Sequence, residues 1–140
     1  MKKKVLFLCT HNSVRSQMAE GLLRALFDDR YEVYSAGTQP TEVNPYAVNV
    51  MTEIGIDISG HEAKNVEKYI GEEFDYVITV CDNAKETCPI FPKGKKNIHK
   101  GFEDPSSFIG NEQEVLDKFR QLRNEITGWI KNTFGDYIKY

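Results

Sequence analysis

One stretch decides the fold: Val5-Leu6-Phe7-Leu8, then Cys9-Thr10-His11-Asn12-Ser13-Val14-Arg15-Ser16. Its first four residues form a continuous apolar run, which predicts a β-strand buried on both faces. Residues 16–27 place apolar side chains at helical spacing and predict a helix. A cysteine therefore follows a buried strand, an arginine precedes a helix, and a short loop joins the two.

The rest of the chain alternates strands and helices. Further strands are predicted at residues 31–36, 76–80 and 97–99, and further helices at 45–55, after Asn44-Pro45, and at 112–134. This alternation predicts a three-layer α/β/α fold with a four-stranded parallel sheet, in one domain over residues 1–140. Cys9 and Cys81 each follow a strand, so we expect both at the edge where such sheets bind ligands.

The composition is that of a globular protein and excludes several other classes. Of 140 residues, 40% are hydrophobic and 28% are charged. No apolar run approaches the ~20 residues of a membrane span, and the net charge of −3 gives no reason to expect nucleic-acid or membrane binding. The first apolar run is too short for a secretory signal, and three cysteines are an odd number for a secreted disulfide framework. We therefore expect a cytoplasmic protein.

The loop after the first strand has the chemistry of an oxyanion site. Where a loop turns into a helix N-terminus, several backbone N–H groups point at one place and bind an anion. Arg15 adds a planar guanidinium that donates two hydrogen bonds to a tetrahedral oxyanion, and the same positive field favours the Cys9 thiolate. Ser16 is placed to donate its hydroxyl to that sulfur and to cap the helix. The predicted oxyanion-binding residues are Thr10, His11, Asn12, Ser13, Val14, Arg15 and Ser16.

These residues belong to a wider resemblance that covers nearly the whole chain. The segment from Phe7 to Glu20 resembles the low-molecular-weight tyrosine phosphatase superfamily. Within it, the chain is most similar to the thioredoxin-coupled arsenate reductases, which share Gln17 where the phosphatases normally have proline. The resemblance continues through Tyr34-Ser35-Ala36-Gly37, Asn44-Pro45, residues 55–59, Val80-Cys81, Cys88-Pro89 and Phe102-Glu103-Asp104-Pro105.

The resemblance implies a mechanism. Cys9 attacks arsenic, Arg15 stabilises the developing charge, and Asp104 protonates the departing oxygen. Cys81 then attacks Cys9 and releases arsenite, and Cys88 attacks Cys81 to leave a disulfide that external thioredoxin reduces. We expect no bound cofactor and no metal, because the chain has no C-x2-C pair and its three histidines show no ligand spacing, and we expect a monomer.

Asp104 has a rival for the role of general acid in the neighbouring Glu103. Proline at position 105 holds Asp104 in an extended conformation, which steadies its carboxyl. An Asp-Pro pair is also a common turn, so the dipeptide alone favours a structural role, whereas the resemblance favours Asp104 as the general acid.

The spacing of Cys81 and Cys88 suggests a switch. Seven residues of helix rise about 10.5 Å, whereas a disulfide tolerates Cα separations only up to about 7 Å. If residues 82–87 are helical, closing the disulfide must unwind them. The alternative is that both cysteines are ordinary buried thiols.

Several positions depart from the family pattern. Some reductases bind potassium through an aspartate at the position of Lys64, so we expect an ammonium group in place of that cation. His11 stands where glycine is common, and is interpreted either as a surface loop residue or as part of the oxyanion site. His61 resembles the phosphatase branch. The other potassium positions are matched by Asn12, Glu20 and Ser35.

Two other functions stay open on the sequence. A phosphatase of the same fold, acting on phosphotyrosine or a small phosphoester, needs only Cys9 and leaves the other cysteines inert. An oxyanion-binding or redox-sensing module binds its ligand with negligible turnover. Cysteine variants separate the three hypotheses, because only the reductase needs all three cysteines.

Overall fold

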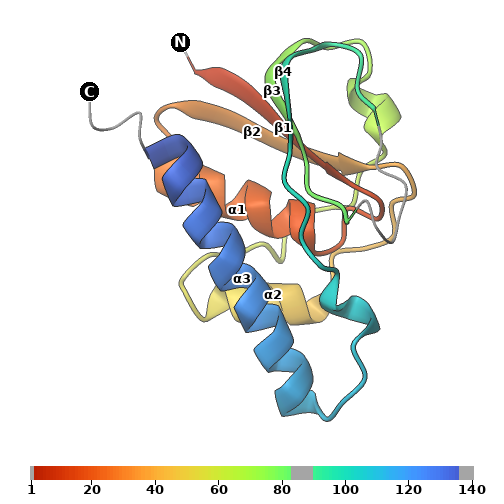
Figure 1. Ribbon diagram of the computed structural model, residues 1–140, viewed down its shortest axis with the longest axis vertical. Helices are drawn as coiled ribbons and strands as arrows, with labels where there is room; N and C mark the ends of the chain where they lie inside the picture. Colours follow the sequence, from red (N-terminus) through yellow and green to blue (C-terminus); the bar gives the residue numbers. More distant parts are fainter. Residues whose placement is uncertain (1, 83–89, 136–140) are drawn as a thin grey trace.

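The computed structural model describes residues 2–82 and 90–135 (Figure 1). In this part of the chain, a sheet of four parallel strands runs in the order β2-β1-β3-β4. The strands are β1 (Lys3–Cys9), β2 (Tyr31–Gly37), β3 (Phe74–Thr79) and β4 (Gly94–His99). The helices are α1 (Arg15–Phe27), α2 (Pro45–Thr52) and α3 (Glu112–Gly135), with 3-10 helices η1 (Val66–Tyr69) and η2 (Pro105–Ser107).

The strand β1 is buried on both faces, as its apolar run predicts. Val5 and Phe7 belong to the core that α1 and α3 cover, whereas Leu6 and Leu8 face the opposite side, where Tyr69 of η1 packs. In Figure 1, α1 and α3 lie on one side of the sheet and η1 lies on the other. The predicted α/β/α layering is confirmed, and among the described residues η1 supplies the helix of the second outer layer.

Two predicted elements, β4 and α2, differ from the structure by three residues at one end, whereas β1 and β3 differ by no more than two residues at either end. β4 spans Gly94–His99 rather than residues 97–99, because its first half carries glycine and two lysines at an exposed sheet edge, where no apolar residue marks a strand. The helix after Asn44 ends at Thr52, and a turn continues to Gly55, whose φ of 79° suits glycine. Asn44 caps that helix as predicted, with its side chain accepting a hydrogen bond from the first turn.

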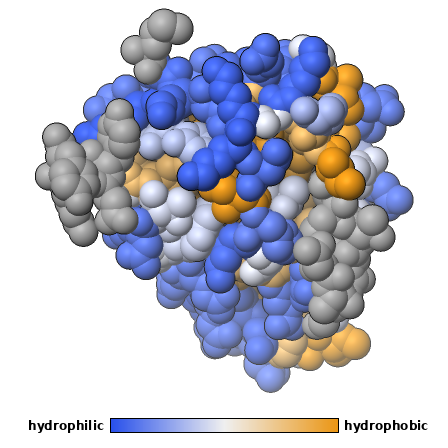
Figure 2. Space-filling model, turned by 45° about the horizontal axis from the view of Figure 1, so that its top comes forward, coloured by the Kyte–Doolittle hydropathy of each residue, from blue (hydrophilic) through white to orange (hydrophobic). Residues whose placement is uncertain are grey.

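The molecular surface is mainly hydrophilic in the view of Figure 2, with apolar side chains in separate small patches. The longest described helix, α3, carries charged residues along its length. No helix in the described part of the chain combines the length and apolar character needed to cross a bilayer.

The carboxyl edge of the sheet brings the two predicted strand-end cysteines together. Cys9 ends β1 and pairs in register with Gly37 of β2, while Cys81 lies just beyond the end of β3. Because β1 and β3 are hydrogen-bonded parallel neighbours, both cysteines leave the sheet at the same edge, as predicted. Gly37 is required here, since a Cβ on it would lie 2.5 Å from the carbonyl oxygen of Thr10.

Candidate active site

Two hydrogen-bond donors converge on the buried sulfur of Cys9. The backbone N–H of Asn12 lies 3.3 Å from its Sγ, and the hydroxyl oxygen of Ser16 lies 2.9 Å from it. The Ser16 oxygen already accepts a hydrogen bond from the Asn12 side chain at 2.8 Å. Its own hydrogen is therefore available to donate to the sulfur, as expected from the sequence.

The prediction that Ser16 also caps α1 is wrong. The helix begins at Arg15, its N-cap position is Val14, and no side chain caps its first turn. Ser16 is already the second helical residue, so its side chain is beyond the position from which a cap reaches those N–H groups. The helix end therefore presents N–H groups and a positive dipole end to an anion.

Asn12 fixes the shape of the loop. It is fully buried and has a φ of 51°, a left-handed conformation that asparagine tolerates better than most residues. Its Nδ2 donates to the hydroxyls of Ser16 and Ser35 at 2.8 and 2.9 Å. Its Oδ1 accepts from the backbone N–H of Lys64 at 2.8 Å. These contacts tie the loop to α1, to β2 and to the segment before η1.

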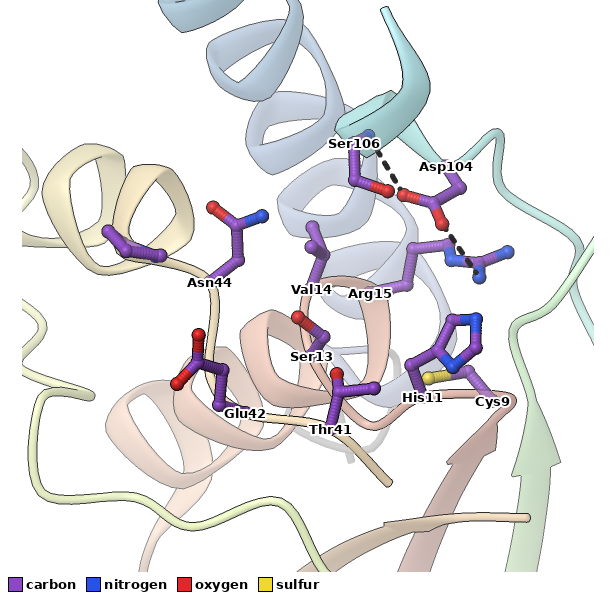
Figure 3. A pocket seen from close by; sticks show the side chains of 11 residues that line it. Cys9, His11, Ser13, Val14, Arg15, Thr41, Glu42, Asn44, Asp104 and Ser106 are labelled. Carbon is purple, nitrogen blue, oxygen red and sulfur yellow. Dashed lines mark hydrogen bonds and ion pairs between the residues drawn. The ribbon is translucent and has the colours of Figure 1, made fainter. Parts of the chain in front are cut away.

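Arg15 and Asp104 meet at the opening of the site. The guanidinium of Arg15 is almost completely buried, and its NH1 group donates to the carbonyl oxygen of Phe102 at 3.3 Å. Its NH2 group lies 3.5 Å from Oδ2 of Asp104, whose other oxygen accepts from the N–H of Ser106 at 2.9 Å. Asp104 has the extended backbone predicted for a residue before proline. In Figure 3 the guanidinium lies between this carboxylate and Cys9.

These groups line a cleft of about 290 Å³ (Figure 3). Part of its rim comes from the segment after β2 and from η2. Among the described residues that line it, there is no phenylalanine, tyrosine or tryptophan. The lining residues are Cys9, His11, Ser13, Val14, Arg15, Thr41, Glu42, Asn44, Pro45, Asp104 and Ser106.

Some of the residues predicted to bind an oxyanion line the cleft, and others lie behind it. His11 lines the cleft, and its Nδ1 donates to the carbonyl oxygen of Gln39 at 3.0 Å. Of the two candidate carboxylates, Asp104 lines the cleft and Glu103 does not. Within the loop, His11, Ser13, Val14 and Arg15 line the cleft, whereas Thr10, Asn12 and Ser16 do not.

The residues predicted for the site did not include Thr41, Glu42, Asn44 and Pro45, which form part of the rim. Backbone hydrogen bonds hold them against the loop: Thr41 N–H donates to the His11 carbonyl at 3.2 Å, and Asn44 N–H to the Ser13 carbonyl at 3.1 Å. A signal was available, because Asn44-Pro45 starts a helix soon after a parallel strand ends, and ligands gather at that edge.

The sequence and the fold both match those of known proteins. The family model for low molecular weight phosphotyrosine protein phosphatases matches residues 4–133. The chain belongs to this family. It is 44% identical over 135 residues to an arsenate reductase of Halalkalibacterium halodurans, a match that covers 96% of each chain.

Solved structures of low molecular weight phosphatase-like proteins share the fold. An arsenate reductase in its phosphate-binding state matches with a TM-score of 0.80 and 34% identity, over 97% of this chain and 98% of that one. A thioredoxin-dependent arsenate reductase of Corynebacterium glutamicum matches with a TM-score of 0.62 and 28% identity, over 94% of this chain and 63% of that one.

In this member of the family, Lys64 supplies positive charge beside a buried carboxylate. Its Nζ lies 3.5 Å from Oε1 of Glu20, which also accepts a hydrogen bond from the Ser35 hydroxyl. Arg24 contacts the other carboxylate oxygen at 2.7 Å. Burial raises the pKa of Glu20, but these partners outweigh burial and leave that pKa below its usual value. The Lys64 ammonium group therefore lies beside the carboxylate of Glu20.

The cysteines differ in bonding state. Cys9 is a free thiol, whereas Cys81, which is fully buried, is disulfide-bonded. Cys88 and the predicted helix beyond Asp82 lie outside the described residues, so the proposed unwinding stays a prediction.

Proposed function

We propose that this protein is an arsenate reductase, acting as a cytoplasmic monomer that thioredoxin regenerates. The observation that carries the proposal is the meeting of Cys9, Arg15 and Asp104 in a polar cleft whose described lining has no phenylalanine, tyrosine or tryptophan. A phosphotyrosine ring is a large apolar group, which binding sites bury against apolar and aromatic side chains. A small inorganic oxyanion needs only the charge and hydrogen bonds that this cleft offers.

The first step is nucleophilic attack on arsenic. The Cys9 thiolate forms a bond to As(V), and one oxygen of arsenate leaves as water. Arg15 and the N–H groups of the loop stabilise the charge on the remaining oxygens. Asp104 supplies the proton, because its side chain lines the cleft and is 29% exposed to solvent.

The second step reduces the arsenic. The Cys81 thiolate attacks the Cys9 sulfur, the sulfur–arsenic bond breaks, and its electron pair converts As(V) to As(III). Arsenite leaves and a disulfide joins Cys9 to Cys81. The adjacency of β1 and β3 supports this step, since the two cysteines follow neighbouring strand ends.

The third step returns Cys9 to its thiol form. Cys88 attacks Cys81, and thioredoxin reduces the disulfide that these two residues form. The thioredoxin dependence of the Corynebacterium glutamicum relative supports the choice of reductant. Electrons arrive through thioredoxin, so the cycle needs no bound cofactor.

Arsenite production with two reducing systems tests the proposal. We expect sustained turnover with thioredoxin, thioredoxin reductase and NADPH, and little turnover with glutathione and glutaredoxin. Cys88→Ser is the matched control, because it keeps the oxyanion site and should stop after the first round. Absence of arsenite with both systems would contradict the reductase assignment, and equal turnover with glutaredoxin would contradict the choice of thioredoxin.

The second candidate is a phosphatase acting on small phosphoesters. The family model favours it, as does a cleft in which Cys9, Arg15 and Asp104 suffice for phosphoester hydrolysis. This candidate predicts that p-nitrophenyl phosphate hydrolysis survives in Cys81→Ser and Cys88→Ser. If the protein hydrolyses p-nitrophenyl phosphate far more efficiently than it reduces arsenate, phosphatase activity is its primary function.

A further inference from the structure

Gln17 has no part in the reaction steps, yet its carboxamide lies among buried polar atoms next to the loop. The residue is fully buried in the first turn of α1. Its Nε2 lies 3.1 and 3.0 Å from the carbonyl oxygen and Oδ1 of Asn12, and 2.9 Å from the carbonyl oxygen of Glu62. All three atoms are acceptors, so the amide nitrogen must face them, and the orientation of the carboxamide is determined.

His61 contacts the other end of that carboxamide. Its Nδ1 lies 3.0 Å from Oε1 of Gln17, an oxygen that carries no hydrogen, so Nδ1 is the donor. Its Nε2 lies 3.4 Å from NH1 of Arg24, a group that only donates, so Nε2 is unprotonated. The partners therefore define a neutral imidazole with its hydrogen on Nδ1. Burial lowers the pKa of His61 and outweighs the opposing charge of Glu20, in agreement with this form.

We propose that Gln17 and His61 are positioning residues of the oxyanion loop. His61 fixes the carboxamide of Gln17, which in turn holds the carbonyl oxygen and the side chain of Asn12. These two attachments hold the left-handed backbone of Asn12. They also fix the peptide group between Asn12 and Ser13, whose N–H belongs to Ser13, a residue that lines the cleft. The inference rests on the proposed oxyanion site, but it holds whether the substrate is arsenate or a phosphoester.

The other contacts of Asn12 separate this role from a general effect on folding. When Gln17 is replaced, the Asn12 side chain keeps Ser16, Ser35 and the Lys64 N–H as partners, so it stays anchored. The Asn12 carbonyl oxygen loses the hydrogen bond that Gln17 donates. The peptide group is then freer to rotate, and anion affinity falls more than stability does.

The test is the dissociation constant for inorganic phosphate, measured by titration calorimetry on the reduced full-length protein. Gln17→Met keeps the side-chain length without hydrogen bonds and should raise that constant about tenfold. His61→Phe should raise it about threefold. His61→Asn offers an amide donor near the place of Nδ1 and should stay within about twofold of wild type. Ile130→Val, in the core of α3, is the control that lowers stability without changing phosphate affinity.

Several outcomes would overturn the inference. The inference is wrong if Gln17→Met binds phosphate as tightly as wild type or Ile130→Val does. If Gln17→Met does not fold, the two His61 variants provide the test. Equal phosphate affinities for His61→Phe and His61→Asn would contradict the inference. Nitrogen-15 chemical shifts that place the His61 hydrogen on Nε2 at neutral pH also contradict it. Wild-type protein that binds phosphate but never reduces arsenate contradicts the proposed reductase and leaves this inference standing.

Discussion

The loop under Cys9 and the turn that carries Asp104 border the same cleft, but they are built in opposite ways. The centre of the loop is buried at Asn12 and Val14, and Asn12 has partners on its backbone and on both polar atoms of its side chain. The turn is a short 3-10 helix at the surface, where Asp104 is held by the Ser106 N–H and by Arg15. In the proposed mechanism, anion binding therefore relies on preorganised donors, whereas proton transfer uses a carboxyl in contact with solvent.

The largest effects are expected where the buried loop supplies the chemistry itself. Cys9→Ser should abolish arsenate reduction and phosphoester hydrolysis, because it removes the nucleophile. Arg15→Ala should lower the rate of arsenite production about 10³-fold, since it removes donors that stabilise the transition state. Arg15→Lys keeps the charge without the planar pair of donors, and its rate should fall between those of wild type and Arg15→Ala. Appreciable arsenite production by Cys9→Ser would contradict the whole assignment.

The next effect tests the exposed turn. Asp104→Asn should slow arsenate reduction by ~10²–10⁴-fold through loss of the general acid, while phosphate affinity and the unfolding midpoint stay close to wild type. Glu103→Gln is the matched control and should keep near-normal rates, because Glu103 does not line the cleft. If Asp104→Asn reduces arsenate at nearly the wild-type rate and Glu103→Gln is inactive, the general acid is Glu103 and the assignment of Asp104 is wrong.

The buried loop should also contribute to stability in a way that the turn does not. Asn12→Ala removes the side-chain hydrogen bonds to Ser16, Ser35 and the Lys64 backbone, and should lower the free energy of unfolding by about 2–3 kcal/mol in urea titrations. Asn49→Ala, an exposed substitution in α2, should change it by less than about 0.5 kcal/mol. If Asn12→Ala and Asp104→Asn lower the free energy of unfolding by similar amounts, the loop and the turn do not differ in their contribution to stability.

The smallest effect concerns acid pH. Burial raises the pKa of Glu20, but Lys64, Ser35 and Arg24 lower it further, so the folded-state pKa lies below the unfolded value of 4.5. The ionised carboxylate therefore stabilises the fold above pH 4.5, and this contribution disappears as the pH falls through the folded-state value. Glu20→Gln should flatten the decline of the urea midpoint below pH 4.5. An unchanged slope would show that Glu20 does not contribute in this way.

The fold was predictable because its signals are local. An apolar run predicts β1 in the middle of the sheet, and Asn44-Pro45 predicts the start of α2. The first half of β4 escaped prediction because its backbone pairs with β3 while its lysines face solvent at an exposed edge. Pairing with a neighbouring strand, rather than side-chain pattern, makes that segment a strand.

The candidate site was predictable only where its residues are close in sequence. The spacing between Cys9 and Arg15, set between a strand and a helix, identified the loop. The left-handed Asn12 and the contacts of Gln17 depend on residues 61–64, which no sequence pattern connects to the loop. The incorrect cap at Ser16 has the same origin, because its hydroxyl bonds to Cys9 and Asn12 instead of to the helix.

Arsenite released per enzyme without any external reductant tests the central claim most directly. Reduced wild-type protein should release about one arsenite per chain and end with Cys81 joined to Cys88 in peptide maps. Cys88→Ser should also release about one, but end with Cys9 joined to Cys81, and Cys81→Ser should release none. No arsenite from wild type, or undiminished release from Cys81→Ser, would contradict reduction through this relay of cysteines.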